Sequence, residues 1–204
     1  VQAGSMARFI AHDGFLYALD GHELMVYEAV PGGSPEHLVT IEVYAEAETL
    51  YPYEKTLFVG TRQGMLVYDL RDPRAPELLG KAVHVLSCDP VVVENGIAYV
   101  TLRSAGCRQG VNALLVFDVK DPTNPKELAR HPLASPHGLD IDGTTLFVAD
   151  KTDGLLVFDM RDPLQPLLLA KVPDIAGYDV IARAGILFVS ADDGIYQYPY
   201  GPQS

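Results

Sequence analysis

The strongest constraint on the fold is a segment that the chain repeats almost unchanged. "LLVFDVKDPTNP" runs from Leu114 to Pro125, "LLVFDMRDPLQP" from Leu155 to Pro166, and "MLVYDLRDPRAP" from Met65 to Pro76. Each copy joins an apolar run to an aromatic residue, an aspartate and a turn that contains Asp-Pro. A motif that recurs in this way indicates a repeat protein, in which each copy is one structural unit packed on its neighbours.

The spacing of the repeats indicates a β-propeller. The valine before the aromatic residue recurs after 41, 49 and 41 residues, at Val26, Val67, Val116 and Val157, and a weaker fifth unit ends in "GIYQYP" from Gly194. In the fourth unit, turn residues separate four apolar segments, "GLDID", "TTLFVAD", "LLVFDM" and "PLLLAKVP", as expected for four strands. A period near 40 residues with four short strands is typical of propeller blades.

We therefore predict an all-β, five-bladed β-propeller of roughly 41-residue four-stranded repeats, with an incomplete last blade. The units span about 6–45, 46–86, 87–134, 135–175 and 176–204 of a single domain, and residues 1–5 resemble a cloning remnant. The last unit stops after its third strand, so the edge at "GIYQYPY", blunted by Pro199, could pair with a second chain, which would be self-association, or with a segment that this sequence does not include. The side chains predicted to be buried between blades are Val26, Val67, Val116, Val157, Phe58, Phe147 and Phe188.

The Asp-Pro-x-x-Pro segment that follows each of the three clear motifs has a structural explanation. Proline fixes φ and cannot donate to a strand ladder, so the chain must reverse there before the next strand. The carboxylates of Asp72, Asp121 and Asp162 are expected to accept hydrogen bonds from the backbone amides of these turns. Similarly, "DKTDG" and "ADDG" in the last two units have the chemistry of hairpin turns rather than of calcium loops.

The three motifs "LVYDLRDPRAP", "LVFDVKDPTNP" and "LVFDMRDPLQP" resemble the LVIVD repeat, named for its Leu-Val-Ile-Val-Asp core followed by Asp-Pro and a second Pro. The first and last units resemble it weakly, and "LMVYEAVPGGSP" replaces Asp-Pro by a Gly-Gly turn. The resemblance implies a β-propeller from an exported or cell-surface protein of bacteria or archaea, mostly without an assigned activity. The protein would instead be cytoplasmic if Met6 were its native start.

Charge and hydropathy narrow the classes of partner. The chain has 15 Lys and Arg against 27 Asp and Glu, and its formal charge of −12 would repel the phosphates of nucleic acids. It has no apolar run long enough to cross a bilayer, so membrane insertion is not expected. We therefore expect a protein, a peptide or a small polar ligand as the partner.

In a propeller, the first strand of each blade lines the central channel, so the starts of these strands should meet at one opening, the funnel mouth. The candidate ligand-binding residues at the funnel mouth are Arg8, Glu48, Asp89, His137, Tyr178 and Asp179. Glu48, Asp89 and His137 combine carboxylates with an imidazole, a ligand set that suits a divalent metal. The alternative is that all six are ordinary solvated residues.

The third unit carries eight extra residues between its second and third strands, in "RSAGCRQGVN". Long loops on rigid scaffolds often carry recognition, which makes Arg103, Arg108 and Gln109 candidate contacts, although a tolerated insertion explains the loop equally well. Cys88 and Cys107 belong to the same face of the predicted propeller. They could form a disulfide, or they could be two free thiols in a reducing compartment.

Two functions remain open from the sequence. We favour a non-enzymatic binding scaffold that uses one loop face and the central funnel and needs no cofactor. The alternative is a metal-dependent, hydrolase-like enzyme at the funnel mouth, whose catalytic residues the sequence does not identify. An enzyme should bring acids and His137 close together with shifted pKa values, whereas a recognition module should present a broader apolar or aromatic patch.

Overall fold

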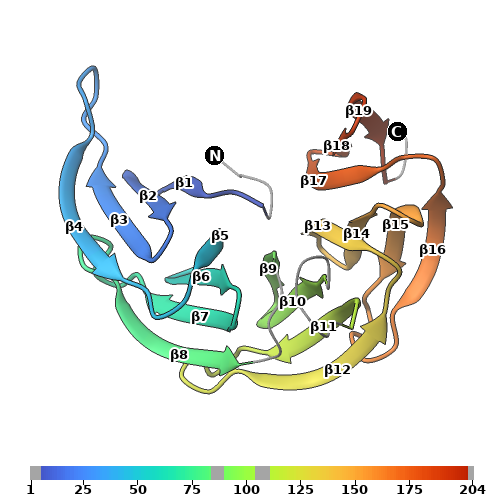
Figure 1. Cartoon of the computed structure of the whole chain (residues 1–204), viewed down its shortest axis with the longest axis horizontal. Coiled ribbons are helices and arrows are strands. Elements are labelled where there is room, and N and C mark those ends of the chain that lie inside the picture. The colour runs from blue at the N-terminus through green and yellow to red at the C-terminus, as the bar shows by residue number, and fades with distance from the viewer. Residues whose placement is uncertain (1–5, 84–89, 104–110, 202–204) are drawn as a thin grey trace.

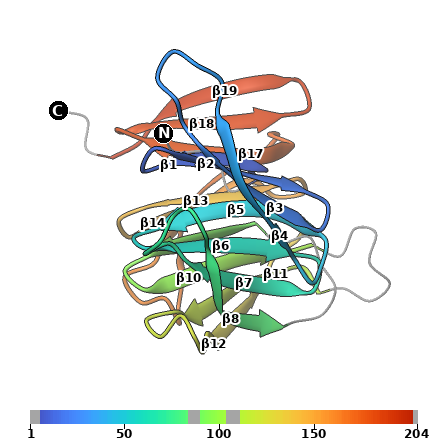
Figure 2. The ribbon, with the colours of Figure 1, turned by 90° about the vertical axis from the view of Figure 1, so that its left-hand side faces the viewer.

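The computed structural model describes residues 6–83, 90–103 and 111–201, and it is a five-bladed β-propeller (Figure 1). The blades follow one another around a central axis, and Figure 2 shows them from the side with blade 1 nearest the viewer. All the regular structure in these three ranges is antiparallel strand, without helix. The same ranges accordingly hold no helix that could cross a membrane.

Nineteen strands form the five sheets, and each sheet is built from strands that are consecutive in the chain. The four complete blades have four strands each. Blade 1 contains β1 (Phe9–His12), β2 (Phe15–Asp20), β3 (Glu23–Glu28) and β4 (Glu36–Glu42). Blade 2 contains β5 (Ala47–Tyr53), β6 (Thr56–Thr61), β7 (Gly64–Asp69) and β8 (Glu77–Val83).

Blade 3 contains β9 (Val91–Glu94), β10 (Ile97–Leu102), β11 (Ala113–Asp118) and β12 (Lys126–Pro132). Blade 4 contains β13 (Pro136–Asp142), β14 (Thr145–Asp150), β15 (Gly154–Asp159) and β16 (Leu167–Val172). Blade 5 has only β17 (Gly177–Arg183), β18 (Ile186–Ala191) and β19 (Gly194–Pro199). The predicted fold, with an incomplete last blade, is therefore confirmed.

The repeated pair of valine and aromatic residue marks a β-bulge. In every four-stranded blade, the register between the third and fourth strands shifts between these two residues, after Val26, Val67, Val116 and Val157. A bulge bends the strand and increases its twist. Blade 5 has no fourth strand, and Gln197 of β19 stands where the other blades carry this valine.

The Asp-Pro turns are built as predicted. The side-chain Oδ1 atoms of Asp72, Asp121 and Asp162 accept hydrogen bonds from backbone N–H groups two residues later, at 3.1, 3.1 and 3.0 Å. The aspartate that ends each third strand, at Asp69, Asp118 and Asp159, caps the chain in the same way at 2.8 to 3.0 Å. These carboxylates satisfy amides that the proline turn leaves outside the ladder.

Four apolar clusters lie at the four interfaces between successive blades. The aromatic residue of each second strand faces the next blade, and Tyr17, Phe58, Tyr99 and Phe147 are at most 3% exposed. Each interface is completed by an aliphatic residue on the first strand of the following blade, namely Leu50, Val91, Leu139 and Val180. The repeat therefore builds the same interface four times.

The prediction of burial was correct for most of the repeat positions but wrong for Phe188 and Val157. Phe188 is 37% exposed, because no further blade packs on that side of blade 5. Val157 is only partly buried, because the fourth strand that would cover it is missing from blade 5. On the opposite flank, Phe9 of blade 1 is 68% exposed, and Figure 1 shows these two blades facing each other across the open part of the ring.

Candidate functional site

Three of the predicted funnel-mouth residues occupy equivalent bulges. The pairing of the first and second strands skips Glu48 in blade 2, His137 and Gly138 in blade 4, and Tyr178 in blade 5. A bulge turns a side chain away from the alternation of the strand and is common next to binding sites. The turns between the second and third strands lie on the same face, which brings Lys151 and Asp192 to the funnel mouth as well.

His137 lies at the centre of the candidate site and is buried. Its Nε2 atom is 2.8 Å from Nη1 of Arg103, and its Nδ1 atom is 3.0 Å from the backbone oxygen of Ser135. Arginine can only donate, so Nε2 accepts and the proton lies on Nδ1, where it is donated to Ser135. Burial, followed by the nearby charges of Arg103 and Lys151, lowers the pKa of His137 and favours this neutral tautomer.

Tyr178 joins His137 to a charged pair at the edge of the site. The two rings meet edge to face with their centroids 5.8 Å apart. Lys151 places its Nζ atom 3.7 Å from the centroid of the Tyr178 ring and 3.4 Å from Oδ1 of Asp192. A hydrogen bond with Tyr178 and then one with Asp192 raise the pKa of Lys151, so its charge is held over the aromatic ring.

The residues predicted for blades 1 and 2 have mainly structural contacts. The Nε atom of Arg62 donates to Oε1 of Glu48 at 3.0 Å, and its Nη1 atom lies 2.8 Å from Glu46. Arg8 reaches from blade 1 to the backbone oxygen of Ala47 at 3.4 Å. Glu48 is therefore ion-paired with Arg62 at the funnel mouth and is not an isolated carboxylate.

Asp179 acts at the contact between blades 4 and 5. Its backbone N–H donates to Oγ of Ser190 at 3.2 Å, and its Oδ1 atom accepts from the N–H of Val180 at 2.9 Å. A Cβ atom on Gly138 would lie within 2.1 Å of that same Oδ1 atom. The glycine therefore allows the two blades to approach closely at the mouth.

Several predicted residues lie outside the described part of the chain. These are Asp89, Arg108, Gln109, Cys88 and Cys107, so their contacts and the disulfide stay predictions. Within the described ranges, no group of three or more His, Cys, Asp or Glu side chains could hold a metal ion. Because Asp89 belongs to the proposed set, metal binding by Glu48, Asp89 and His137 stays a prediction too.

The sequence pattern did not single out Lys151, Asp192 or Arg62. All three lie in turns between second and third strands, and their sequences have ordinary hairpin chemistry. Their position in the repeat could have identified them, because the turn between the second and third strands lies on the same face as the start of the first strand in every blade. Aligning both segments, rather than the first strand alone, would have found them.

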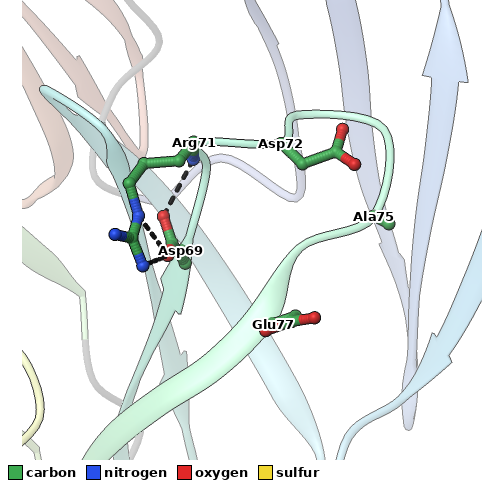
Figure 3. Close-up of a pocket in the computed structure, with 5 residues that line it drawn as sticks. All are labelled: Asp69, Arg71, Asp72, Ala75 and Glu77. Atoms are coloured by element: carbon green, nitrogen blue, oxygen red, sulfur yellow. Dashed lines mark hydrogen bonds and ion pairs between the residues drawn. The ribbon is translucent and has the colours of Figure 1, made fainter.

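A hollow of about 420 Å³ lies on the opposite face, at the Asp-Pro turn of blade 2 (Figure 3). The side chain of Arg71 folds over Asp69, with its Nε atom 2.7 Å from Oδ2 and a backbone bond to Oδ1. The hydrogen bonds from Arg71 lower the pKa of Asp69. Asp72 is engaged in capping its own turn, so the polar groups of this hollow stabilise the loop.

No family model matches this sequence, and no curated protein matches it. Among solved structures, it is similar to BamB from Moraxella catarrhalis, with a TM-score of 0.70 and 11% identity over 94% of this chain and 56% of that one. It is also similar to the computationally designed Ika8 protein, with a TM-score of 0.68 and 15% identity over 94% of this chain and 57% of that one.

A third similar structure is the complex of KlAtg21 with the coiled-coil of AgAtg16, with a TM-score of 0.66 and 13% identity over 91% of this chain and 63% of that one. The chain thus spans less than two thirds of the length of each of these three proteins. At such low identity, the likenesses support the fold alone.

Proposed function

We propose that the chain is a non-enzymatic binding scaffold whose funnel mouth, on blades 3 to 5, recognises an exposed segment of a protein or peptide. The observation that carries this proposal is the meeting of side chains from three blades at His137. Arg103 directly follows β10, His137 comes from β13 and Tyr178 comes from β17. The strands of blades 3 to 5 place these groups at a shared face.

The chemistry of the cluster favours recognition over catalysis. Both ring nitrogens of His137 are engaged, one with Arg103 and one with a backbone carbonyl, so neither is placed to move a proton to or from a substrate. Arg103 and the half-exposed ring of Tyr178 are residue types that often dominate the binding energy of protein interfaces, and Lys151 adds a positive charge beside the ring.

A protein partner is also supported by a structural neighbour, which was solved in complex with a coiled-coil. Membership of the LVIVD-repeat family and a location outside the cytoplasm rest on the resemblance of the three motifs and belong to this proposal. Self-association through the open edge of blade 5, which the sequence offered as a possibility, stays a prediction.

A displayed library of random peptides tests the proposal. Peptides are selected on the wild-type protein, and the affinity of the enriched peptides is then measured by fluorescence anisotropy. We expect Tyr178→Ala and Lys151→Ala to weaken binding at least about tenfold, because each removes one side of the cluster, and that factor corresponds to about 1.4 kcal/mol.

Lys126→Ala is the matched control, since Lys126 is an exposed lysine at the start of an outer strand, at the opposite face. This variant should bind the selected peptides as the wild type does. A library that yields no enriched peptide would overturn the proposal. Peptides that bind all three variants equally would also overturn it, because they would use another surface.

The metal-dependent alternative has its own test. Calorimetry with Zn²⁺, Mn²⁺ and Ca²⁺ measures uptake by the wild type, and His137→Ala should abolish it if Glu48, Asp89 and His137 form the site. The thermal midpoint of the metal-free protein serves as the control for folding. Absence of uptake by the wild type would remove the enzyme hypothesis and leave the scaffold.

A further inference from the structure

The last strand of blade 5, β19, has an unpaired edge. Its backbone groups point in the same directions as those of the third strand in a complete blade. The backbone N–H of Tyr200 donates to Gly185 at 2.9 Å, as that of Met160 does to Thr144 at 2.8 Å in blade 4. Backbone groups alternate along a strand, so Ile195 and Gln197 direct theirs away from β18. In blade 4, the equivalent residues Leu155 and Val157 pair with the fourth strand, β16.

A groove of about 600 Å³ runs beside this free edge, between blades 4 and 5. Its walls are mainly apolar, and among the described residues Asp142 is the one charged group that lines it. The lining includes side chains from β14, β15, β16 and the end of blade 5, among them Phe147, Val157, Leu169, Val172, Tyr198 and Tyr200. The groove therefore lies where a fourth strand of blade 5 would pack on blade 4.

The glycines that begin the third strands point to the same position. A Cβ atom on Gly64 would lie within 2.0 Å of the backbone oxygen of Ala82, and one on Gly154 within 2.1 Å of that of Val172. In both blades the glycine makes room for the outer strand. Gly194 repeats the backbone conformation, with φ of +155° against +146° at Gly64, but no atom lies within 4 Å of its Cβ position.

The outer strand of blade 4 begins with three leucines, of which Leu169 lines this groove and Leu168 lines a second hollow on the side of blade 3. Glu36, Glu77 and Lys126 begin the outer strands of blades 1 to 3, whereas Leu167 begins that of blade 4 and is 58% exposed. The next two residues, Leu168 and Leu169, are also exposed. Because side chains alternate along a strand, Leu169, which is 55% exposed, is the leucine of the three that adds apolar surface to the groove.

We propose that β19 and this groove accept an extended segment of a partner polypeptide as the missing outer strand of blade 5. The segment would run antiparallel to β19 and bond to the backbone of Ile195 and Gln197, as in other cases of strand addition. Alternate residues facing the groove should be branched or aromatic. A basic residue near its start is favoured by Asp142, which lies beside Tyr200 at the end of β19, and by the charge of −12.

A lone strand fits this site better than the edge of a second copy. The site consists of an edge together with a groove, and a single extended segment can fill both. An edge-to-edge pair of β19 strands would satisfy the backbone groups but leave the groove uncovered. Pro199 also removes one outward N–H, which blunts the edge against its own copy.

The test uses a fluorescent peptide that copies residues 161–173, the turn and outer strand of blade 4. We expect saturable binding to the full chain, measured by anisotropy. By analogy with blade 4, the peptide residues that copy Ala170 and Val172 should pair with Gln197 and Ile195. N-methylation at these two peptide residues should weaken binding at least tenfold, because it removes the paired N–H donors.

The matched control is the same peptide methylated at the residue that copies Lys171, whose N–H points away from β19. This peptide should bind as the unmodified one does. Hydrogen exchange supplies a second readout, since the amides of Ile195 and Gln197 should become protected when the unmodified peptide binds. Because only the peptide is changed, a failure to fold cannot explain the result.

Absence of saturable binding, or equal weakening by both kinds of methylation, would overturn the proposal. A dimer that sediments at low concentration and that the peptide cannot dissociate would assign the edge to a second copy and would overturn it as well. Tyr178→Ala should leave the binding of this peptide unchanged. A negative result for the proposed peptide site at the funnel mouth can therefore be distinguished from a negative result for the proposed strand site at β19.

Discussion

Asp140 provides a test of how this fold tolerates a buried charge. It lies in β13 with 1% of its surface exposed, where the other first strands carry Ile10, Tyr51, Val92 and Ile181. Its Oδ2 atom accepts from the N–H of Ala182 in blade 5 at 2.8 Å, and its Oδ1 atom accepts from Ile141 at 2.9 Å. Burial outweighs these bonds and, with the charges of Asp179 and Asp142, raises its pKa from 3.8 to about 7.

The raised pKa makes stability depend on pH in a defined direction. Between pH 3.8 and about 7, the folded protein keeps the proton that the unfolded chain has lost, so stability falls as the pH rises through this window. At about 1.4 kcal/mol per pKa unit, the full loss is roughly 4 kcal/mol, of which roughly 2 to 3 kcal/mol falls between pH 5 and 8. Above the folded pKa, the loss is complete.

Asp140→Asn removes the ionisation while keeping an acceptor for Ala182. Urea unfolding of the wild type and the variant at pH 5, 6, 7 and 8 gives the free energy of unfolding at each pH. The variant should gain roughly 2 to 3 kcal/mol relative to the wild type from pH 5 to pH 8. Asp20→Asn, at an exposed aspartate, is the matched control. Parallel curves for Asp140→Asn and the wild type would refute the reasoning.

Three further predictions follow from the repeat and the cysteines. Phe147→Ala should lower the free energy of unfolding by about 3 to 5 kcal/mol, because Phe147 is buried between blades. Phe188→Ala, at the equivalent but exposed position, should lower it by less than half as much. Equal losses measured by urea unfolding would contradict the exposure of Phe188. Asp121→Ala should lower the urea midpoint, because it removes the acceptor for the N–H and Oγ1 of Thr123. Those bonds lower the pKa of Asp121, so the effect should fade as the pH falls, and a constant effect would contradict this explanation. If Cys88 and Cys107 are bonded, thiol titration of the unreduced, denatured protein should find no free thiol, and two thiols would exclude the disulfide.

Much of the fold could be predicted from the sequence because a propeller blade is a local structure. Each strand pairs with the next one along the chain, so alternating apolar residues, tight turns and the period near 41 residues are enough to count strands and blades. The roles of Asp72, Asp121 and Asp162 were predictable for the same reason, since each acts within its own turn.

The candidate site was predictable only in part. Aligning the repeats placed His137 and Tyr178 at equivalent positions, and the structure brings their rings into contact. The pattern could not show that Arg103 binds Nε2 of His137 or that Lys151 lies over Tyr178, because these contacts join side chains of different blades. Such contacts depend on side-chain rotamers and on the width of the funnel mouth. The repeat pattern of the sequence carries information on neither.

The sequence by itself determined the class of fold and the division of these residues into blades, since both depend on pairing between neighbours in the chain. Only the tertiary structure decided which surfaces stay uncovered. Phe188 follows the same motif as the buried Phe147, and it is exposed because no blade follows it in space. Likewise, Gly194 and Leu169 border open space, because burial depends on what lies opposite a residue rather than on the residue itself.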